Sequence, residues 1–118
     1  MDEIKRHILI VEQDQVLRDE FIKAFLNAGY NVQATDRFQE AVAIVREGNT
    51  KRRPFDLALM DISDKGQLLI ANALHRLSDE LPVFTLRDRS DKLMIIDLLN
   101  QKRGEFLEEF IEMHVKAL

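Results

Sequence analysis

The sequence of 118 residues contains no cysteine, only four glycines and only two prolines. Without cysteine the chain can form no disulfide, no thiolate zinc site and no cysteine nucleophile. The few glycines exclude a glycine-rich phosphate-binding loop, and no serine stands in the glycine elbow that hydrolases use. The three histidines, His7, His75 and His114, fall on different expected elements without the spacing of metal ligands. We therefore expect no histidine metal site, and we expect that the protein is not an enzyme.

Long apolar runs are missing as well. No segment approaches the roughly 20 apolar residues that cross a bilayer, and no signal-like segment opens the chain. We therefore expect a cytoplasmic protein without membrane contact. The formal net charge of −4, with 46% hydrophobic and 32% charged residues, is typical of a globular domain and argues against direct nucleic-acid binding. The one basic cluster, residues 51–53, is interpreted as an exposed loop.

Two short apolar runs that end in acidic residues organise the rest of the chain. Residues 57–60 are apolar and lead into Asp61, and residues 8–11 are apolar and lead into the segment Glu12 to Asp14. Uninterrupted apolar runs of this length predict strands that are buried on both faces. Asp61 then lies at the carboxyl end of a strand, where ligands gather in open α/β sheets. An equally good interpretation makes Asp61 a loop residue that caps the next helix.

The remaining segments alternate between helix and strand patterns. Asp14 is expected to cap a helix that ends at Gly29, and Asp36 with Gln39 resembles a capping box for a second helix that ends at Gly48. Further strands are predicted over residues 30–35, 82–86 and 105–107, and further helices after residue 64, from Ser90 or Asp91, and over 108–118. Five strands that alternate with five helices predict a mostly parallel sheet covered on both faces.

Acidic residues should gather at one edge of this sheet, because the carboxyl ends of parallel strands meet there. Glu12 and Asp14 follow the first strand and Asp61 follows the third, while Arg87 and Asp88 follow the fourth. Carboxylates that converge in this way raise one another's proton affinity unless a cation lies between them, and oxygen ligands suit Mg²⁺. We therefore expect a divalent cation to bind at this edge of the sheet.

The strand motifs and their order resemble the receiver domain of bacterial two-component response regulators. Residues 8–14 resemble the family's first strand with its acidic pair, residues 56–61 its third strand and residues 82–86 its fourth, and Glu105-Phe106-Leu107 stands where the family has Asp-Tyr-Leu. The resemblance implies a flavodoxin-like (βα)5 fold, a three-layer sandwich around a five-stranded parallel sheet. It implies one receiver-like domain over residues 1–118, which can be the N-terminal part of a longer regulator. It also implies that Asp61 accepts a phosphoryl group from a histidine kinase.

Several positions depart from the family pattern. Gln13 replaces the second metal-binding carboxylate, Arg87 replaces the phosphate-binding hydroxyl, and Asp88 replaces a small residue. An ungapped count places Glu109 at the family's lysine. A single donor of this kind is worth roughly 3 kcal/mol, or about a hundredfold in rate, so these losses together should leave phosphotransfer very slow. We therefore expect a pseudo-receiver that acts through protein–protein contacts, with phosphorylation of Asp61 impaired or absent.

Two alternatives stay open. The chain can be a conventionally phosphorylated receiver, or a small metal- or nucleotide-binding flavodoxin-like domain. In the acidic pocket of Glu12, Gln13 and Asp14, the neutral amide leaves Mg²⁺ to Glu12 and Asp61, which should bind it only weakly. Arg87 could stand in for the missing cation by pairing with Asp61 or Glu12, or it could point into water.

The region from residue 93 to 115 is the expected partner surface. Six of the seven residues from Leu93 to Leu99 are apolar, which is more than a core-facing helical stripe needs. The resemblance places the receivers' dimer and output face in the same region. We expect a homodimer through residues 93–115, and contacts with a histidine kinase or another signalling protein. The alternative is that these residues belong to the core and that Asp97 marks the exposed face.

Overall fold

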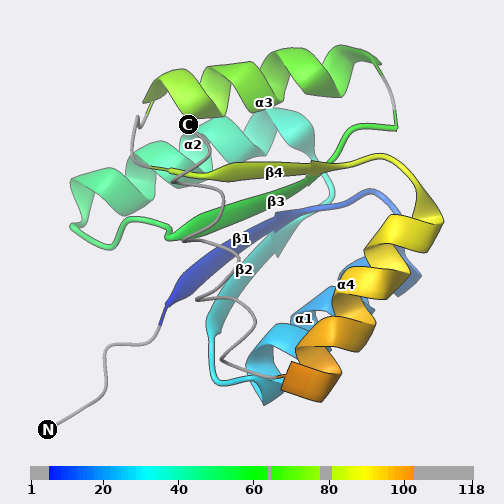
Figure 1. Ribbon diagram of the computed structural model, residues 1–118. Helices are drawn as coiled ribbons and strands as arrows, with labels where there is room; N and C mark the ends of the chain where they lie inside the picture. The colour runs from blue at the N-terminus through cyan, green and yellow to red at the C-terminus, as the bar shows by residue number, and fades with distance from the viewer. Residues whose placement is uncertain (1–5, 64, 78–80, 103–118) are drawn as a thin grey trace, which may run out of the picture.

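The computed structural model describes residues 6–63, 65–77 and 81–102. Strands and helices alternate along the chain in three layers (Figure 1). Helices α2 and α3 cover one face of the sheet, and α1 and α4 cover the other. The strands are β1 (His7–Val11), β2 (Asn31–Thr35), β3 (Leu57–Asp61) and β4 (Val83–Leu86). The helices are α1 (Gln15–Asn27), α2 (Phe38–Thr50), α3 (Lys65–Leu77) and α4 (Arg89–Lys102).

The described strands form one four-stranded parallel sheet in the order β2-β1-β3-β4. This confirms the predicted α/β class with a parallel sheet between two helical layers. The sheet has four strands where five were predicted, because the expected strand 105–107 lies outside the described residues, as does the expected helix 108–118. No helix among residues 6–63, 65–77 and 81–102 is both long enough and apolar enough to cross a membrane.

The two central strands are buried on both faces, as their apolar runs predict. Side chains alternate along a strand, so Ile8 and Ile10 of β1 face the layer of α1 and α4, while Leu9 and Val11 face the layer of α2 and α3. Each such side chain, once buried, stabilises the fold by about 1.5–3 kcal/mol relative to exposure. The core therefore has two halves, one on each side of the sheet, and β3 contributes to both.

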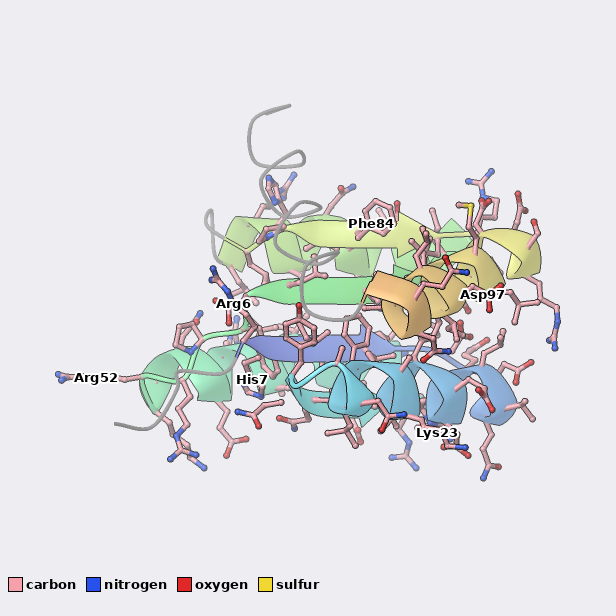
Figure 2. All side chains as sticks on the ribbon, turned by 60° about the horizontal axis from the view of Figure 1, so that its bottom comes forward. Arg6, His7, Lys23, Arg52, Phe84 and Asp97 are labelled. Carbon is pink, nitrogen blue, oxygen red and sulfur yellow. The ribbon has the colours of Figure 1, made fainter. Side chains whose placement is uncertain are left out.

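The ends of the first helix agree with the sequence. Asp14 is the N-cap of α1, and its Oδ1 accepts hydrogen bonds from the backbone N–H groups of Val16 (2.9 Å) and Leu17 (3.1 Å). Gly29 follows the helix with φ at +95°, in the left-handed region that glycine adopts without steric cost. The basic cluster at residues 51–53 is exposed, as predicted, and Arg52 extends away from the end of α2 (Figure 2).

Two predictions for the second helix were wrong. The N-cap is Arg37 and has no side-chain cap bond, so Asp36 and Gln39 form no capping box. Thr35 Oγ1 organises this end instead: it accepts from the Arg37 N–H (3.1 Å) and donates to Glu40 Oε2 (3.1 Å). The helix also continues beyond Gly48 to Thr50. Gly48 is small for another reason, because a Cβ there would lie 2.9 Å from the carbonyl oxygen of Arg53.

The apolar segment of α4 divides between core and surface. Ile95, Ile96 and Leu99 are buried between α4, α1 and the sheet, which supports the core interpretation for these three residues. Leu93 and Met94 keep 41% and 53% of their surface exposed. Asp97 is exposed as well, on α4 in Figure 2. The predicted homodimer through residues 93–115 stays a prediction.

Candidate functional site

Two carboxylates meet at the carboxyl edge of the sheet. Parallel pairing sets Val11 of β1 opposite Met60 of β3, so Glu12, which directly follows β1, and Asp61, the last residue of β3, lie at the same edge of the sheet. Both side chains are almost completely buried, at 3% and 4% exposure. The prediction that Glu12 and Asp61 lie close together is therefore consistent with the structure.

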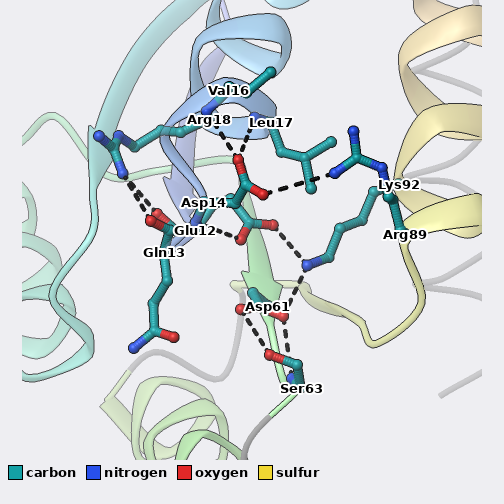
Figure 3. A network of polar contacts seen from close by, with 10 residues as sticks. All are labelled: Glu12, Gln13, Asp14, Val16, Leu17, Arg18, Asp61, Ser63, Arg89 and Lys92. Atoms are coloured by element: carbon teal, nitrogen blue, oxygen red, sulfur yellow. Dashed lines mark hydrogen bonds and ion pairs between the residues drawn. The ribbon is translucent and has the colours of Figure 1, made fainter.

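A lysine from α4 joins the two carboxylates. The ammonium nitrogen Nζ of Lys92 lies 2.8 Å from Glu12 Oε1 and 2.8 Å from Asp61 Oδ1 (Figure 3). Lys92 is itself only 5% exposed. Its helix begins directly after the loop that leaves β4, and the backbone N–H of Lys92 donates to the carbonyl of Asp88 (3.2 Å). The first turn of α4 thus carries a cation into the acidic pocket.

Both carboxylates also accept hydrogen bonds from residues of the loops that follow their strands. Asp61 Oδ1 also accepts from the backbone N–H of Ser63 (3.0 Å), and Asp61 Oδ2 accepts from the Ser63 hydroxyl (3.1 Å). Glu12 Oε2 accepts from the backbone N–H of Asp14 (3.1 Å). Each of the four oxygens therefore has a donor. Buried carboxylates are tolerated when they are paired and hydrogen-bonded in this way.

Burial by itself lowers the pKa of Lys92, but the hydrogen bonds to Asp61 and Glu12, together with the negative charges of both groups, outweigh burial. The net effect raises the pKa of Lys92 above its usual value of 10.5. Lys92 is therefore charged at neutral pH, and the three side chains form a buried ion triad with one positive and two carboxyl members.

The raised pKa of Lys92 predicts a loss of stability at alkaline pH. Above the usual value of 10.5 the folded protein holds this proton and the unfolded chain releases it, so the free energy of unfolding falls as the pH rises through the folded pKa. Below pH 10.5 both states hold the proton, and the raised pKa of Lys92 makes its full contribution to the free energy of unfolding. Urea midpoints of the wild type and of Lys92→Met, measured from about pH 9 to 12, should converge as the pH rises. The other lysines are present in both proteins, so their titration does not change the difference between the two midpoints. A difference that stays constant as the pH rises would contradict the prediction.

The structure places the other predicted site residues outside this triad. Asp14 caps α1 and makes a long ion pair with Arg89 (3.7 Å) at the rim. Gln13 is exposed, and none of the contacts drawn in Figure 3 involves its side-chain amide. Arg87 and Asp88 are exposed on the loop that precedes α4. Glu109 lies outside the described residues.

The hypothesis that Arg87 supplies the missing cation is wrong for this structure, because Lys92 holds that position. The reason is helical geometry: Lys92, Ile95, Ile96 and Leu99 share one face at spacings of three, four and seven residues. Packing the three apolar residues into the core turns Lys92 inward at the end of the helix nearest the sheet edge. A lysine in line with a buried stripe was the available sequence signal, and it was missed.

Mg²⁺ does not fit the pocket in this arrangement. Magnesium needs several oxygens at about 2 Å in octahedral geometry. The Lys92 ammonium contacts the two oxygens that would face such an ion, and Gln13 offers no charge. Within the part of the chain that the structure describes, no group of three or more His, Cys, Asp or Glu side chains is placed to hold a metal. The pocket therefore suits the ammonium group of Lys92 better than a bound metal ion.

Comparisons with known proteins show the fold. No protein-family model matches the sequence, and no curated protein sequence matches it significantly. Solved structures do match. The chemotaxis protein CheY4 of Vibrio cholerae is 15% identical with a TM-score of 0.62, over 94% of this chain and 99% of that chain. A response regulator from Thermotoga maritima is 19% identical with a TM-score of 0.58, over 86% and 80%. A de novo designed Rossmann 2x2 protein is 16% identical with a TM-score of 0.60, over 86% and 92%.

These identities are too low to show more than architecture. Because natural response regulators and a designed protein match about equally well, the similarity by itself does not select a function. The chain therefore has an α/β flavodoxin-like fold that it shares with response regulators.

Proposed function

We propose that this chain is a receiver-like signalling domain of the pseudo-receiver kind, which acts through protein–protein contacts and lacks the ordinary phosphorylation switch. The observation that carries the proposal is the bridge from Lys92 to Glu12 and Asp61, at 2.8 Å on each side. The fold supports the receiver-like part of the proposal, and the bridge supports the loss of the switch.

Two features of Asp61 oppose phosphorylation. A phosphoryl donor must approach a carboxylate oxygen in line, yet Asp61 is 4% exposed and both of its oxygens already accept hydrogen bonds. Negative charge that develops on the phosphoryl group also needs a cation placed beside it. The Lys92 ammonium is shared with Glu12, so releasing it for a phosphoryl group would leave a buried carboxylate without its partner.

Partners, cofactor and location follow as parts of the same proposal. The domain would contact a histidine kinase or another signalling protein, would work in the cytoplasm and would catalyse no reaction of its own. Any binding of Mg²⁺ through Glu12 and Asp61 would be weak, because the Lys92 ammonium already contacts both carboxylates. The domain would not bind nucleic acid directly. Self-association through residues 93–115 would use the exposed Leu93 and Met94 at the start of that region.

Incubation with acetyl phosphate and Mg²⁺ tests the proposal. We expect intact mass spectrometry to find almost no phosphorylated wild-type protein under conditions in which a conventional receiver is fully labelled. Asp61→Asn serves as the background control, because it removes the acceptor oxygen. Rapid stoichiometric labelling that Asp61→Asn abolishes would contradict the proposal.

A conventional phosphorylated receiver is the second candidate, and one observation favours it. Receivers use a lysine beside the phosphoacceptor, and Lys92 places an ammonium against Asp61 although it comes from a different element. The variant Lys92→Met separates the two functions in the same assay. If Lys92 closes the pocket, the variant is labelled faster than the wild type. If Lys92 assists phosphotransfer, the variant is labelled more slowly.

A further inference from the structure

A groove of about 340 Å³ lies between α2 and α3, on the side of the sheet opposite α4 and its lysine (Figure 1). Val42 of α2 and Ala73 and Leu77 of α3 line it, and all three are half-buried. Leu69 stands at the same groove with 73% of its surface exposed, more than any other large apolar residue among those described. An exposed leucine beside an apolar depression is typical of a binding surface.

Two arginines flank this apolar lining, one from each helix. Arg46 of α2 and Arg76 of α3 both line the groove and both are exposed. Neither guanidinium has an ion pair or a side-chain hydrogen bond with the rest of the described chain. Two other surface cations are paired: Arg37 with Glu40, and Lys51 with Glu47. The groove therefore combines an apolar lining with two exposed arginines that form no ion pair within the described residues.

We propose that this groove docks an acidic amphipathic helix of a protein partner. Apolar residues on one face of that helix would cover Leu69 and fill the depression, and its carboxylates would pair with Arg46 and Arg76. The proposal does not depend on whether Asp61 is phosphorylated, since the groove lies between α2 and α3 and none of its lining residues belongs to the ion triad at the carboxyl edge of the sheet.

Charge and symmetry argue against two other occupants of the groove, nucleic acid and a second copy of this chain. Nucleic acid binds continuous basic surfaces, whereas this groove is mainly apolar between its two arginines and the chain carries a net charge of −4. A second copy that docked groove to groove would form a two-fold interface, and that symmetry would set arginine against arginine. An acidic amphipathic segment satisfies both the apolar lining and the charges.

The test uses a fluorescein-labelled synthetic peptide with leucines at positions i, i+3, i+4 and i+7 and glutamates beside them. A second peptide replaces every glutamate with lysine. We expect fluorescence anisotropy at low salt to show saturable binding of the acidic peptide and at least about tenfold weaker binding of the basic one. Amide chemical shifts should change at Val42 and Ala73 when the acidic peptide is added.

Variants locate the binding to the groove. The double substitution Arg46→Glu with Arg76→Glu, and separately Leu69→Ser, should each weaken the acidic peptide about tenfold or more. The matched controls are Arg53→Glu, an exposed arginine outside the groove, and Leu26→Ser, which is 54% exposed on α1. All substituted side chains are on the surface, so circular dichroism should show unchanged folding; if a glutamate variant is unfolded, Arg46→Gln with Arg76→Gln replaces it.

Three results would overturn the proposal: no saturable binding of the acidic peptide, equal binding of both peptides, or unchanged affinity in the groove variants. Failure here would leave the acetyl phosphate experiment unaffected. Labelling of Asp61 would likewise leave the groove in place, so the two proposals fail separately.

Discussion

Replacing Lys92 with methionine is expected to lower the free energy of unfolding by about 3–5 kcal/mol at neutral pH. Methionine has nearly the length of lysine, so the change leaves little empty volume. It removes the ammonium that contacts both Glu12 and Asp61, and two nearly buried carboxylates then face each other without this cation. The expected loss is the cost of those uncompensated charges. Urea denaturation followed by circular dichroism measures it.

Two substitutions serve as controls for this prediction. Lys51→Met removes a lysine whose ion pair with Glu47 is exposed, and we expect no measurable change in stability. Arg87→Ala removes the arginine that the sequence suggested as the pocket cation, and its exposure predicts a change within about 0.5 kcal/mol. If Lys92→Met costs no more than these controls, the ion triad does not hold the fold together.

The second large effect is a gain of metal binding. Lys92→Met removes the ammonium from the space between Glu12 and Asp61. Gln13→Asp restores the second metal-binding carboxylate of the receiver pattern. We expect this double variant to be stabilised by Mg²⁺, by about 2.7 kcal/mol at a concentration one hundred times the dissociation constant. The wild type should show no such stabilisation, because Lys92 occupies the place of the cation.

Thermal unfolding with and without MgCl₂ measures this gain, with KCl at equal ionic strength to separate specific binding from charge screening. Adding Asp61→Asn to the double variant should abolish the Mg²⁺ effect, because it removes one ligand charge. Stabilisation of the wild type by the same amount would show that Lys92 does not exclude the ion. Absence of any effect in the double variant would show that the pocket is closed by something other than the lysine.

Local patterns in the sequence were sufficient for the elements that surround the site. The apolar runs at residues 8–11 and 57–60 predict the two buried strands, and these strands place Glu12 and Asp61 at one edge. Asp14 and Gly29 predict the ends of α1, since a cap and a left-handed glycine act through neighbouring residues. The fifth strand, expected at 105–107, lies outside the described residues.

The start of α2 was less predictable, because two local signals competed. Asp36 with Gln39 has the spacing of a capping box, but Thr35 at the end of β2 is close enough to accept from Arg37 and to donate to Glu40. The position of Thr35 follows from the pairing of β2 with β1, which is a long-range contact. Sequence spacing alone therefore favoured the wrong cap.

By itself, the sequence determined which strands are buried, that they run parallel, and that carboxylates gather where they end. The cation that joins those carboxylates was decided only by the tertiary structure. Residues 12, 61 and 92 are far apart along the chain, and their meeting depends on how α4 packs its apolar face against α1 and the sheet. That packing turns Lys92 inward and leaves Arg87 in solvent, although both carry the same charge and lie five residues apart. Spacing along one strand or helix specifies the face on which a side chain lies, but the partner across the core follows from the assembly of the layers.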